Sequence, residues 1–342
     1  MYLKGLKTMI TIKEYNKYSQ ISLENRHGIK INLLNYGATV KDFLIPGRKS
    51  PLDNIVLSLE SPEYYNLERT YLGATVGRVI GRIKNGVWLD GKAIHNFDLN
   101  DGVTHAHGGF NGLDTQVYNY EIEDNIDCSK VYFHLIDPDG HNNYPGNLEM
   151  SVIYTLDQND TLSYEIKATT DKKTIFNPAN HSYFNLNSGN NILDQYLSID
   201  ADYYLALDEN NIPFKKAQKV KESVFDFRNP TLIGKAIRSN DPQIKSQLGL
   251  NHPFLLNKNG KIDATLESLD HQRRLELSTT APSIVVYTGN HFNHRGYTKN
   301  IGQYAGVALE TQVPPSQDEQ LREITLLPDE RFYRRTSWHI DF

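Results

Sequence analysis

Short segments of alternating polar and apolar residues recur along the chain and constrain its fold more than any other feature. They are bounded by Gly, Asn, Asp and Pro. Such alternation between turn-forming residues is typical of antiparallel strands that bury one face. The clearest segments are GIKINLLNYGATVKDFLIP (28–46), LEMSVIYTL (148–156), TLSYEIKATT (161–170) and APSIVVYTGN (281–290).

Turn and helix signals between these segments are short. DQND at 157–160 and KNGK at 258–261 predict hairpin turns. The segments 61–69 and 241–249 each place Pro directly after a capping Ser or Asp, which predicts a brief helix. Because these helices do not alternate with strands, a parallel α/β fold is not expected. We predict an all-β, large antiparallel β-sandwich with a few short helices.

Domain organisation follows from the evenness of the pattern. Strand signals continue from about residue 10 to 340 without a Pro/Ser-rich linker, a charge run or an internal repeat. We therefore expect residues 1–342 to form a single domain. Residues 1–8 add no visible pattern, so Met9 is an alternative start and these residues an N-terminal extension.

Composition narrows the class of protein. Hydrophobic residues make up 39% of the chain, with 21 Tyr and 13 Phe, which is enough for a large core. A net charge of −5 argues against nucleic-acid binding, which needs clustered Lys and Arg. Cys128 is the only cysteine, and no apolar run approaches the ~20 residues of a membrane span. We expect a cytoplasmic protein, monomeric or homodimeric, without membrane contact.

Two Gly-rich segments carry candidate binding residues. YLGATVGRVIGRIKNG (71–86) holds Arg78 and Arg82, which are either surface arginines or donors to hydroxyl or carboxylate oxygens. THAHGGFNGLD (104–114) holds His105 and His107, two residues apart as on one strand face. A metal site is the weaker interpretation of this pair, because no third ligand motif follows. The double glycine instead predicts a tight loop that presents one imidazole.

Two further segments place polar groups on a strand face. In NPANHSYFNLN (177–187), His181 lies among Asn and Tyr while Phe184 and Leu186 point the other way. In QYAGVALETQVPPS (303–316), alternation puts Gly306, Ala308, Glu310 and Gln312 on one face. Small residues beside a carboxylate and an amide predict a groove floor rather than an exposed strand.

These four segments, in this order, resemble the aldose 1-epimerase family, the galactose mutarotases. The resemblance extends from about residue 10 to 342 and includes 35–47 (NYGATVKDFLIPG), 137–156, 225–237 and 287–290 (YTGN). It implies a galactose mutarotase-like supersandwich that holds a free monosaccharide in an open cleft. It also implies an isomerase that needs no metal or cofactor and interconverts the α and β anomers of aldohexoses such as galactose and glucose.

The resemblance also assigns roles to residues. Mutarotation removes a proton from the C1 hydroxyl and delivers one to the ring oxygen, and the ring then opens, rotates about C1–C2 and closes on either face. By similarity Glu310 is the base and His181 the acid. Arg82, His107 and Asn251 are the implied sugar-binding residues. A carboxylate is ionised at neutral pH and an imidazole titrates close to it, which suits a reversible proton exchange.

Three positions depart from the family's usual pattern. Asn251 replaces the usual Asp before His, Gly81 stands where many members have Asn, and Val285 stands where some have Gln. An amide keeps an acceptor oxygen but loses the negative charge. Anomer interconversion is therefore better supported by the sequence than a preference for galactose.

The sequence is compatible with other functions. A non-catalytic carbohydrate-binding protein would need no acid and base, so the retained Glu310, His181 and His107 argue against it. A mutarotase-like enzyme acting on another sugar or sugar derivative is a second alternative. A glycoside hydrolase usually needs two carboxylates, but nothing around Asp200, Asp208 or Asp226 singles out a partner for Glu310. Gln312 has no assigned role.

Overall fold

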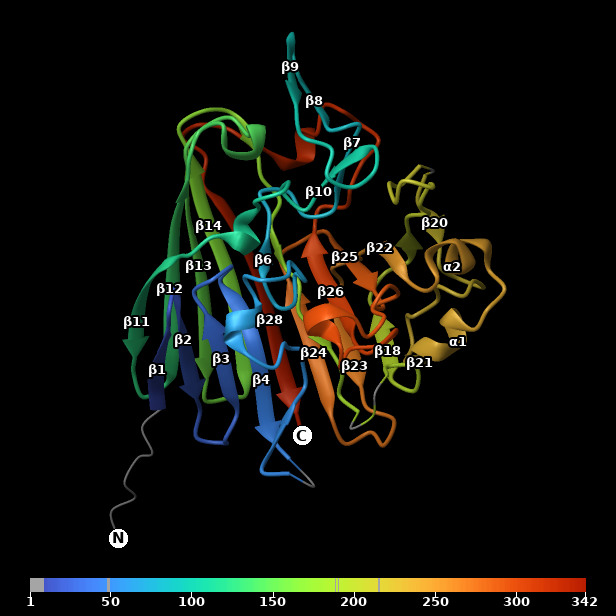
Figure 1. Cartoon of the computed structure of the whole chain (residues 1–342). Coiled ribbons are helices and arrows are strands. Elements are labelled where there is room, and N and C mark those ends of the chain that lie inside the picture. Colours follow the sequence, from blue (N-terminus) through green and yellow to red (C-terminus); the bar gives the residue numbers. More distant parts are fainter. Residues whose placement is uncertain (1–8, 48–49, 188, 190, 215) are drawn as a thin grey trace.

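Strands dominate the computed structural model, which describes residues 9–47, 50–187, 189, 191–214 and 216–342 (Figure 1). The predicted N-terminal extension, residues 1–8, lies outside this description. Every strand pairing within the sheets of the described residues is antiparallel. The prediction of an all-β antiparallel sandwich is confirmed.

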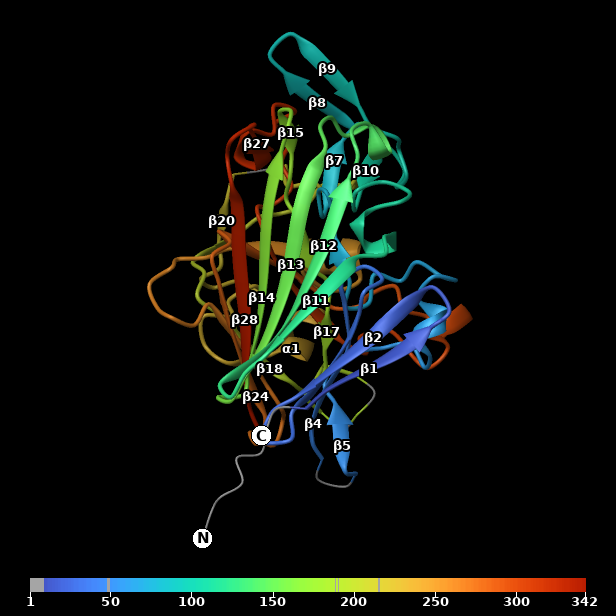
Figure 2. The same ribbon diagram turned by 90° about the vertical axis from the view of Figure 1, so that its left-hand side faces the viewer.

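A nine-stranded sheet forms one layer, and its long central strands run side by side in both views (Figures 1 and 2). The alternating segments 148–156 and 161–170 lie in its centre and are joined by the predicted hairpin turn at 157–160. In spatial order its strands are β11 (Asn119–Asp124), β12 (Cys128–Asp137), β13 (Leu148–Asp157), β14 (Thr161–Thr170), β28 (Phe332–Asp341), β24 (Arg274–Thr279), β23 (Ala264–Glu267), β18 (Tyr196–Ile199) and β21 (Thr231–Leu232).

Two smaller sheets form the facing layer. The first is a meander of N-terminal strands: β1 (Met9–Tyr15), β2 (Tyr18–Glu24), β3 (Lys30–Leu34), β4 (Thr39–Pro46) and β5 (Leu52–Asn54). The second carries the site described below, in the order β17 (Tyr183–Phe184), β26 (Val307–Gln312), β25 (Ser283–Tyr287), β22 (Asn251–Leu255), β19 (Tyr203–Tyr204) and β20 (Gln218–Lys219).

Short two-stranded pairs lie outside these three sheets. The hairpin of β8 (Val87–Asp90) and β9 (Ala93–Asn96) projects from one end of the molecule (Figures 1 and 2). The remaining pairs are β6 (Thr75–Val76) with β16 (Ala179–Asn180), β7 (Arg82–Lys84) with β10 (Thr104–Ala106), and β15 (Thr174–Ile175) with β27 (Thr325–Leu326).

Helices are brief and decorate connections. Within the described ranges the α-helices are α1 (Ile233–Ile237) and α2 (Pro242–Gln247). The predicted helix at 241–249 is α2, capped by the Asp241 carboxylate on two backbone N–H groups. The predicted helix at 61–69 reduces to a 3-10 turn, η1 (Pro62–Tyr64), capped by Ser61. The other 3-10 turns are η2 (Leu113–Thr115), η3 (His141–Asn143), η4 (Gly296–Thr298) and η5 (Arg322–Ile324).

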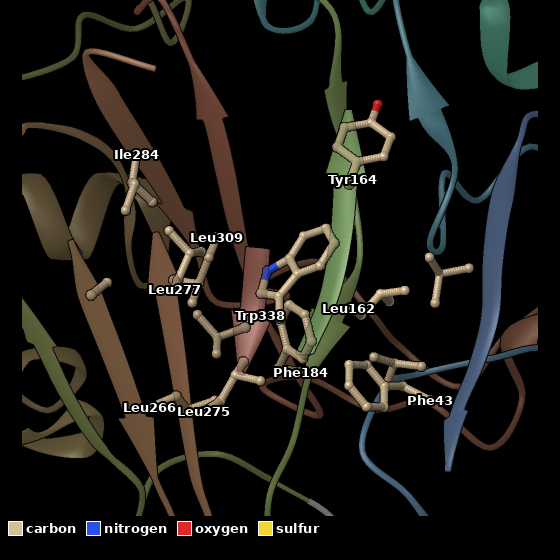
Figure 3. Packing of buried hydrophobic residues seen from close by; sticks show 14 of the residues in the cluster. Phe43, Leu162, Tyr164, Phe184, Leu266, Leu275, Leu277, Ile284, Leu309 and Trp338 are labelled. Atoms are coloured by element: carbon tan, nitrogen blue, oxygen red, sulfur yellow. The ribbon is translucent and has the colours of Figure 1, made fainter. Parts of the chain in front are cut away.

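The hydrophobic core lies between the layers (Figure 3). Trp338 of β28 packs on Phe184 of β17, with ring centroids 5.9 Å apart. Leu277 of β24 and Leu309 of β26 approach from opposite layers and are fully or almost fully buried. Packing of this kind fixes which face of β26 points inward, because strand side chains alternate. The single-domain prediction is not tested by these observations and stays a prediction.

One predicted turn is wrong. KNGK at 258–261 does not close a hairpin, because the strand before it, β22, belongs to the six-stranded sheet and the strand after it, β23, to the nine-stranded sheet. The segment is therefore a crossing between layers. Gly and Asn mark a chain reversal in either case, so local turn signals do not distinguish a hairpin from a crossing.

Candidate active site

A cavity of ≈ 330 Å³ opens over the outer side of the six-stranded sheet, and all five sequence-predicted site residues line it. Its volume lies at the low end of the range for small-molecule pockets. The two proposed catalytic residues, Glu310 and His181, are almost fully buried at 4% exposure each. The implied sugar-binding residues are Arg82, His107 and Asn251.

β26 presents Glu310 to this cavity by strand alternation. Leu309 packs in the core, and the Thr311 hydroxyl contacts Thr336 of β28 at 2.6 Å, so the intervening Glu310 points the opposite way. Gln312 follows on the same outer side and also lines the cavity. The predicted groove floor is only partly correct, however. Ala308 packs in a small apolar cluster with Tyr183 and does not line the cavity.

Backbone pairing brings His181 to Glu310 from a distant part of the sequence. The His181 N–H donates to the Ala74 carbonyl, and its own carbonyl accepts from the Gly73 N–H. Two residues later, Tyr183 pairs with Ala308 on β26. As a result His181 Nε2 lies 3.2 Å from Glu310 Oε1. The His181 Nδ1 atom is buried without a hydrogen-bond partner in the described part of the chain.

The loop after β10 presents His107, as the double glycine predicted. His107 has φ +50, and Gly108 and Gly109 also have positive φ, so the chain reverses immediately. The His107 ring lies 5.8 Å from the His181 ring and 4.9 Å from that of Tyr71, measured between centroids. Burial, and then the neighbouring His181 and Arg82, lower the pKa of His107 well below its usual value. His107 is therefore a neutral hydrogen-bonding group.

Arg69 anchors this loop and was not recognised in the sequence. Its guanidinium donates to both carboxylate oxygens of the buried Asp114, at 2.6 Å each, and to the carbonyls of His107, Gly109 and Phe110. It also lies over the Tyr71 ring at 4.7 Å. This set of contacts fixes both the loop and the ring that flanks His107.

The two arginines of the Gly-rich segment have different roles. Arg82 lines the cavity and pairs with Asp101 at 2.8 Å, an ion pair that is partly exposed to solvent. Arg78 is 1% exposed and its Nε lies 2.5 Å from a carboxylate oxygen of Asp137. The interpretation of both as surface arginines is therefore wrong for Arg78, whose charge is satisfied inside the protein.

Asn251 lies at the start of β22 and reaches the opposite side of the cavity. Its side-chain NH₂ donates to the Gln247 Oε1 at 3.0 Å, which leaves its own oxygen available as an acceptor. Gly81 and Val285, the other departures from the family pattern, also line the cavity, and Val285 is the cross-strand partner of Glu310. It therefore supplies an apolar wall beside the carboxylate where an amide would have offered a hydrogen bond.

Burial dominates the electrostatics of the carboxylate. It raises the pKa of Glu310, while His181, Arg82 and the hydrogen bond from Gln312 act in the opposite direction. Gln312 Nε2 lies 2.9 Å from Glu310 Oε2. A buried carboxyl group with a raised pKa beside an imidazole is the arrangement expected of a general acid–base pair.

His105 is structural. It is fully buried, and its ring nitrogens contact the Asp98 carbonyl and the Tyr144 hydroxyl at 2.8 Å each. It lies in a different aromatic cluster from His107, because the backbone reverses between them. The same-face spacing that suggested a metal site is therefore not realised. Within the described residues, no group of three His, Cys, Asp or Glu is placed to hold a metal ion.

Several lining residues were missed by sequence reasoning. They include Tyr71, Asp101 and Tyr287. Tyr71 has φ +60 and reaches the cavity through that unusual conformation, which no local residue pattern announces. Asp101 is the second carboxylate of the cavity, and it is already occupied by Arg82. Among the described residues, no helix is long and apolar enough to cross a membrane.

The fold and the cavity define a β-sandwich protein with one buried carboxylate–imidazole pair facing a polar pocket. Comparisons with known proteins identify the family. The aldose 1-epimerase family model matches residues 19–339. The chain is 34% identical to the aldose 1-epimerase of Escherichia coli K12 over 306 residues, 87% of either chain. It is 33% identical to human galactose mutarotase over 320 residues, 91% of this chain and 90% of the relative.

A solved structure agrees. The crystal structure of galactose 1-epimerase from Lactobacillus acidophilus superposes with a TM-score of 0.92 at 44% identity, covering 98% of this chain and 99% of that one. The chain belongs to the aldose 1-epimerase family.

Proposed function

We propose that this protein is an aldose 1-epimerase, an isomerase that interconverts the α and β anomers of free aldohexoses, with Glu310 as base and His181 as acid. The observation that carries the assignment of roles is the 3.2 Å contact between His181 Nε2 and Glu310 Oε1 inside the cavity. The family and its relatives' names support the reaction itself.

The geometry allows a short proton path. Glu310 takes the proton of the C1 hydroxyl, and His181 donates a proton to the ring oxygen, which is bonded to the same carbon. Closure reverses the roles, with His181 taking the proton from the C5 hydroxyl and Glu310 returning one to O1. Because the two side chains already touch, both can reach two oxygens on a single carbon. Correctly placed proton transfer contributes about 10²–10⁴-fold.

His107, Arg82 and Asn251 would bind the sugar. His107 lines the cavity as a neutral imidazole that can hydrogen-bond a sugar oxygen. Arg82 presents donors to hydroxyl oxygens from beside Asp101. Asn251 offers an uncharged acceptor where the family usually has a carboxylate. We infer that the enzyme accepts glucose as well as galactose.

The rival functions have less support. A non-catalytic sugar-binding protein would not need the desolvated acid–base pair. For a glycoside hydrolase, the sequence candidates Asp200, Asp208 and Asp226 all lie outside the cavity. The second carboxylate that lines the cavity, Asp101, is held in an ion pair with Arg82.

Polarimetry on freshly dissolved α-D-glucose and α-D-galactose tests the proposal. The wild-type protein is expected to accelerate relaxation to the anomeric equilibrium, and Glu310→Gln to relax the sugars at the spontaneous rate. Equal rates with and without wild-type protein would refute the function, and a fully active Glu310→Gln would refute the role of Glu310. Running the assay with a metal chelator tests the prediction that no metal is needed, which requires an unchanged rate.

A further inference from the structure

Gln312 is a buried polar residue that the proposed reaction does not use. It follows Glu310 by two positions on the same side of β26 and is 1% exposed. Its Nε2 donates to Glu310 Oε2 at 2.9 Å, whereas Glu310 Oε1 faces His181. The two oxygens of the carboxylate therefore have different partners.

The backbone under Gln312 is held from several directions. Its carbonyl accepts from the Ser283 hydroxyl at 2.6 Å, and Ser283 is also its cross-strand partner. On the next residue, the Val313 N–H donates to Asn177 Oδ1 and the Val313 carbonyl accepts from Asn177 Nδ2. A side chain that starts from a fixed backbone and ends in a hydrogen bond has little freedom to move.

The orientation of the amide follows from its partner. An ionised carboxylate only accepts hydrogen bonds, so the NH₂ side of the amide must face Glu310. The Gln312 Oε1 atom then points toward the turn at Gly81, and it is buried without a hydrogen-bond partner in the described ranges. A Cβ on Gly81 would lie 3.4 Å from this oxygen and 2.8 Å from Pro315 Cγ. Glycine at position 81 therefore leaves the amide and Pro315 undisturbed.

We propose that Gln312 is a positioning residue for the base. Its amide holds the Glu310 carboxylate ionised and oriented so that Oε1 faces both His181 and the C1 hydroxyl of the sugar. The inference deepens the proposed function and rests on it. A buried carboxylate without this donor would lose a charge-assisted hydrogen bond, and Val285 across the strand offers no replacement.

The groups around Glu310 set the direction of the pH effect. Burial raises the pKa of Glu310, and His181, Arg82 and the Gln312 hydrogen bond lower it. Loss of the Gln312 donor should therefore raise the pKa of the base and reduce its ionised fraction at low pH. The titratable groups that face Glu310 are His181, Arg82, Tyr183 and Tyr287, with His107 behind His181.

The experiment is the pH dependence of kcat/KM for α-D-glucose, which reports the ionisation of the free enzyme. Gln312→Met keeps the length of the side chain but removes the donor. We expect the acid limb of its kcat/KM profile to lie about one pH unit above that of wild type. This shift corresponds to a tenfold lower kcat/KM at low pH. Gln312→Glu places a second carboxylate beside Glu310, so its limb should move further in the same direction.

A matched control removes a buried amide elsewhere. Gln195 is fully buried but contacts Leu186 and Asn185, and it does not line the cavity. Gln195→Met should lower stability while leaving the acid limb where it is in wild type. Circular dichroism and thermal unfolding establish which variants are folded. If Gln312→Met does not fold, the acid limb of Gln312→Glu is compared with that of wild type instead.

The results distinguish a failure of the role of Gln312 from a failure of the proposed function. An acid limb unchanged in folded Gln312 variants, whatever the loss of rate, would overturn the positioning role and leave a structural one. If Glu310→Gln is as active as wild type in the same assay, the assignment of the base fails. If Glu310→Gln is inactive and the limb does not move, only the role of Gln312 fails.

Discussion

Asn251 shows how a single residue tunes this site. Its amide is held by Gln247 and offers the sugar an oxygen without a charge. A carboxylate at this position would form stronger hydrogen bonds to sugar hydroxyls, because charge-assisted bonds are about twice as strong as neutral ones. Within the described part of the chain, the Gln247 side-chain amide has no other hydrogen bond that would prevent it from turning its NH₂ toward the new oxygen.

We therefore expect Asn251→Asp to lower the KM for galactose about five- to tenfold with little change in kcat. Polarimetric rates across a range of galactose, glucose, xylose and maltose concentrations give both parameters. Equal Michaelis constants for the two proteins would show that hydroxyl binding at this position does not depend on charge.

Loops and the ends of strands form the site, and a rigid sheet supports them. Arg69 joins the loop that carries His107 to the buried Asp114 through its whole guanidinium fork. Lysine cannot reproduce those contacts, because its ammonium donates from one nitrogen and lacks the planar fork of three nitrogens. The position of His107 and Tyr71 therefore depends on the arginine itself.

Arg69→Lys is expected to reduce kcat/KM about 10- to 100-fold, because a shift of about 1 Å at a catalytic site can cost that much. The free energy of unfolding should also fall, since Asp114 would be buried with a poorer partner. Arg228 provides the control, because its pairs with Asp202 and Asp226 are partly exposed and outside the cavity. Wild-type kinetics in Arg69→Lys, as in Arg228→Lys, would contradict the anchoring role.

Sequence reasoning was most reliable for elements with strong alternation. The segments at 148–156 and 161–170 and the outward side of Glu310 followed from period two alone. KNGK was misassigned, because the layer that a strand joins depends on contacts far away in sequence. Arg78 and Arg69 were misassigned or missed for the same reason: Asp137 and Asp114 become their partners only in the folded chain. The pairing of His181 with Glu310 came from family resemblance.

Neutral buried histidines make the stability of the whole molecule depend on pH. His252 is fully buried, accepts from the Asn251 N–H at Nδ1 and contacts Gln243 Oε1 through Nε2 at 3.1 Å. Burial lowers the pKa of His252 to about 3. Burial also lowers the pKa values of His105 and His107. Between about pH 6.5 and 3 the unfolded chain binds protons that the folded chain does not, so stability falls as pH falls.

The His252 imidazole alone should lower the free energy of unfolding by about 1.4 kcal/mol per pH unit between about pH 6.5 and 3. Urea denaturation at pH 8, 6 and 5 measures this slope. His252→Asn should be less stable than wild type at pH 8 but show a shallower loss toward pH 5. The exposed His291 is the control. If His252→Asn and His291→Asn both keep the wild-type slope, His252 does not contribute to acid sensitivity.

In the proposed mechanism, Glu310 and His181 act as one proton-transfer unit. Magnetisation exchange between the α and β H1 signals of galactose at equilibrium measures anomer exchange directly, without a change in sugar concentration. Glu310→Gln and His181→Asn should each reduce the exchange rate about 10²–10⁴-fold, and the double variant little further, because residues that act as a unit are not additive. Multiplicative losses, or exchange at the wild-type rate in either single variant, would show that the two residues do not act as one unit.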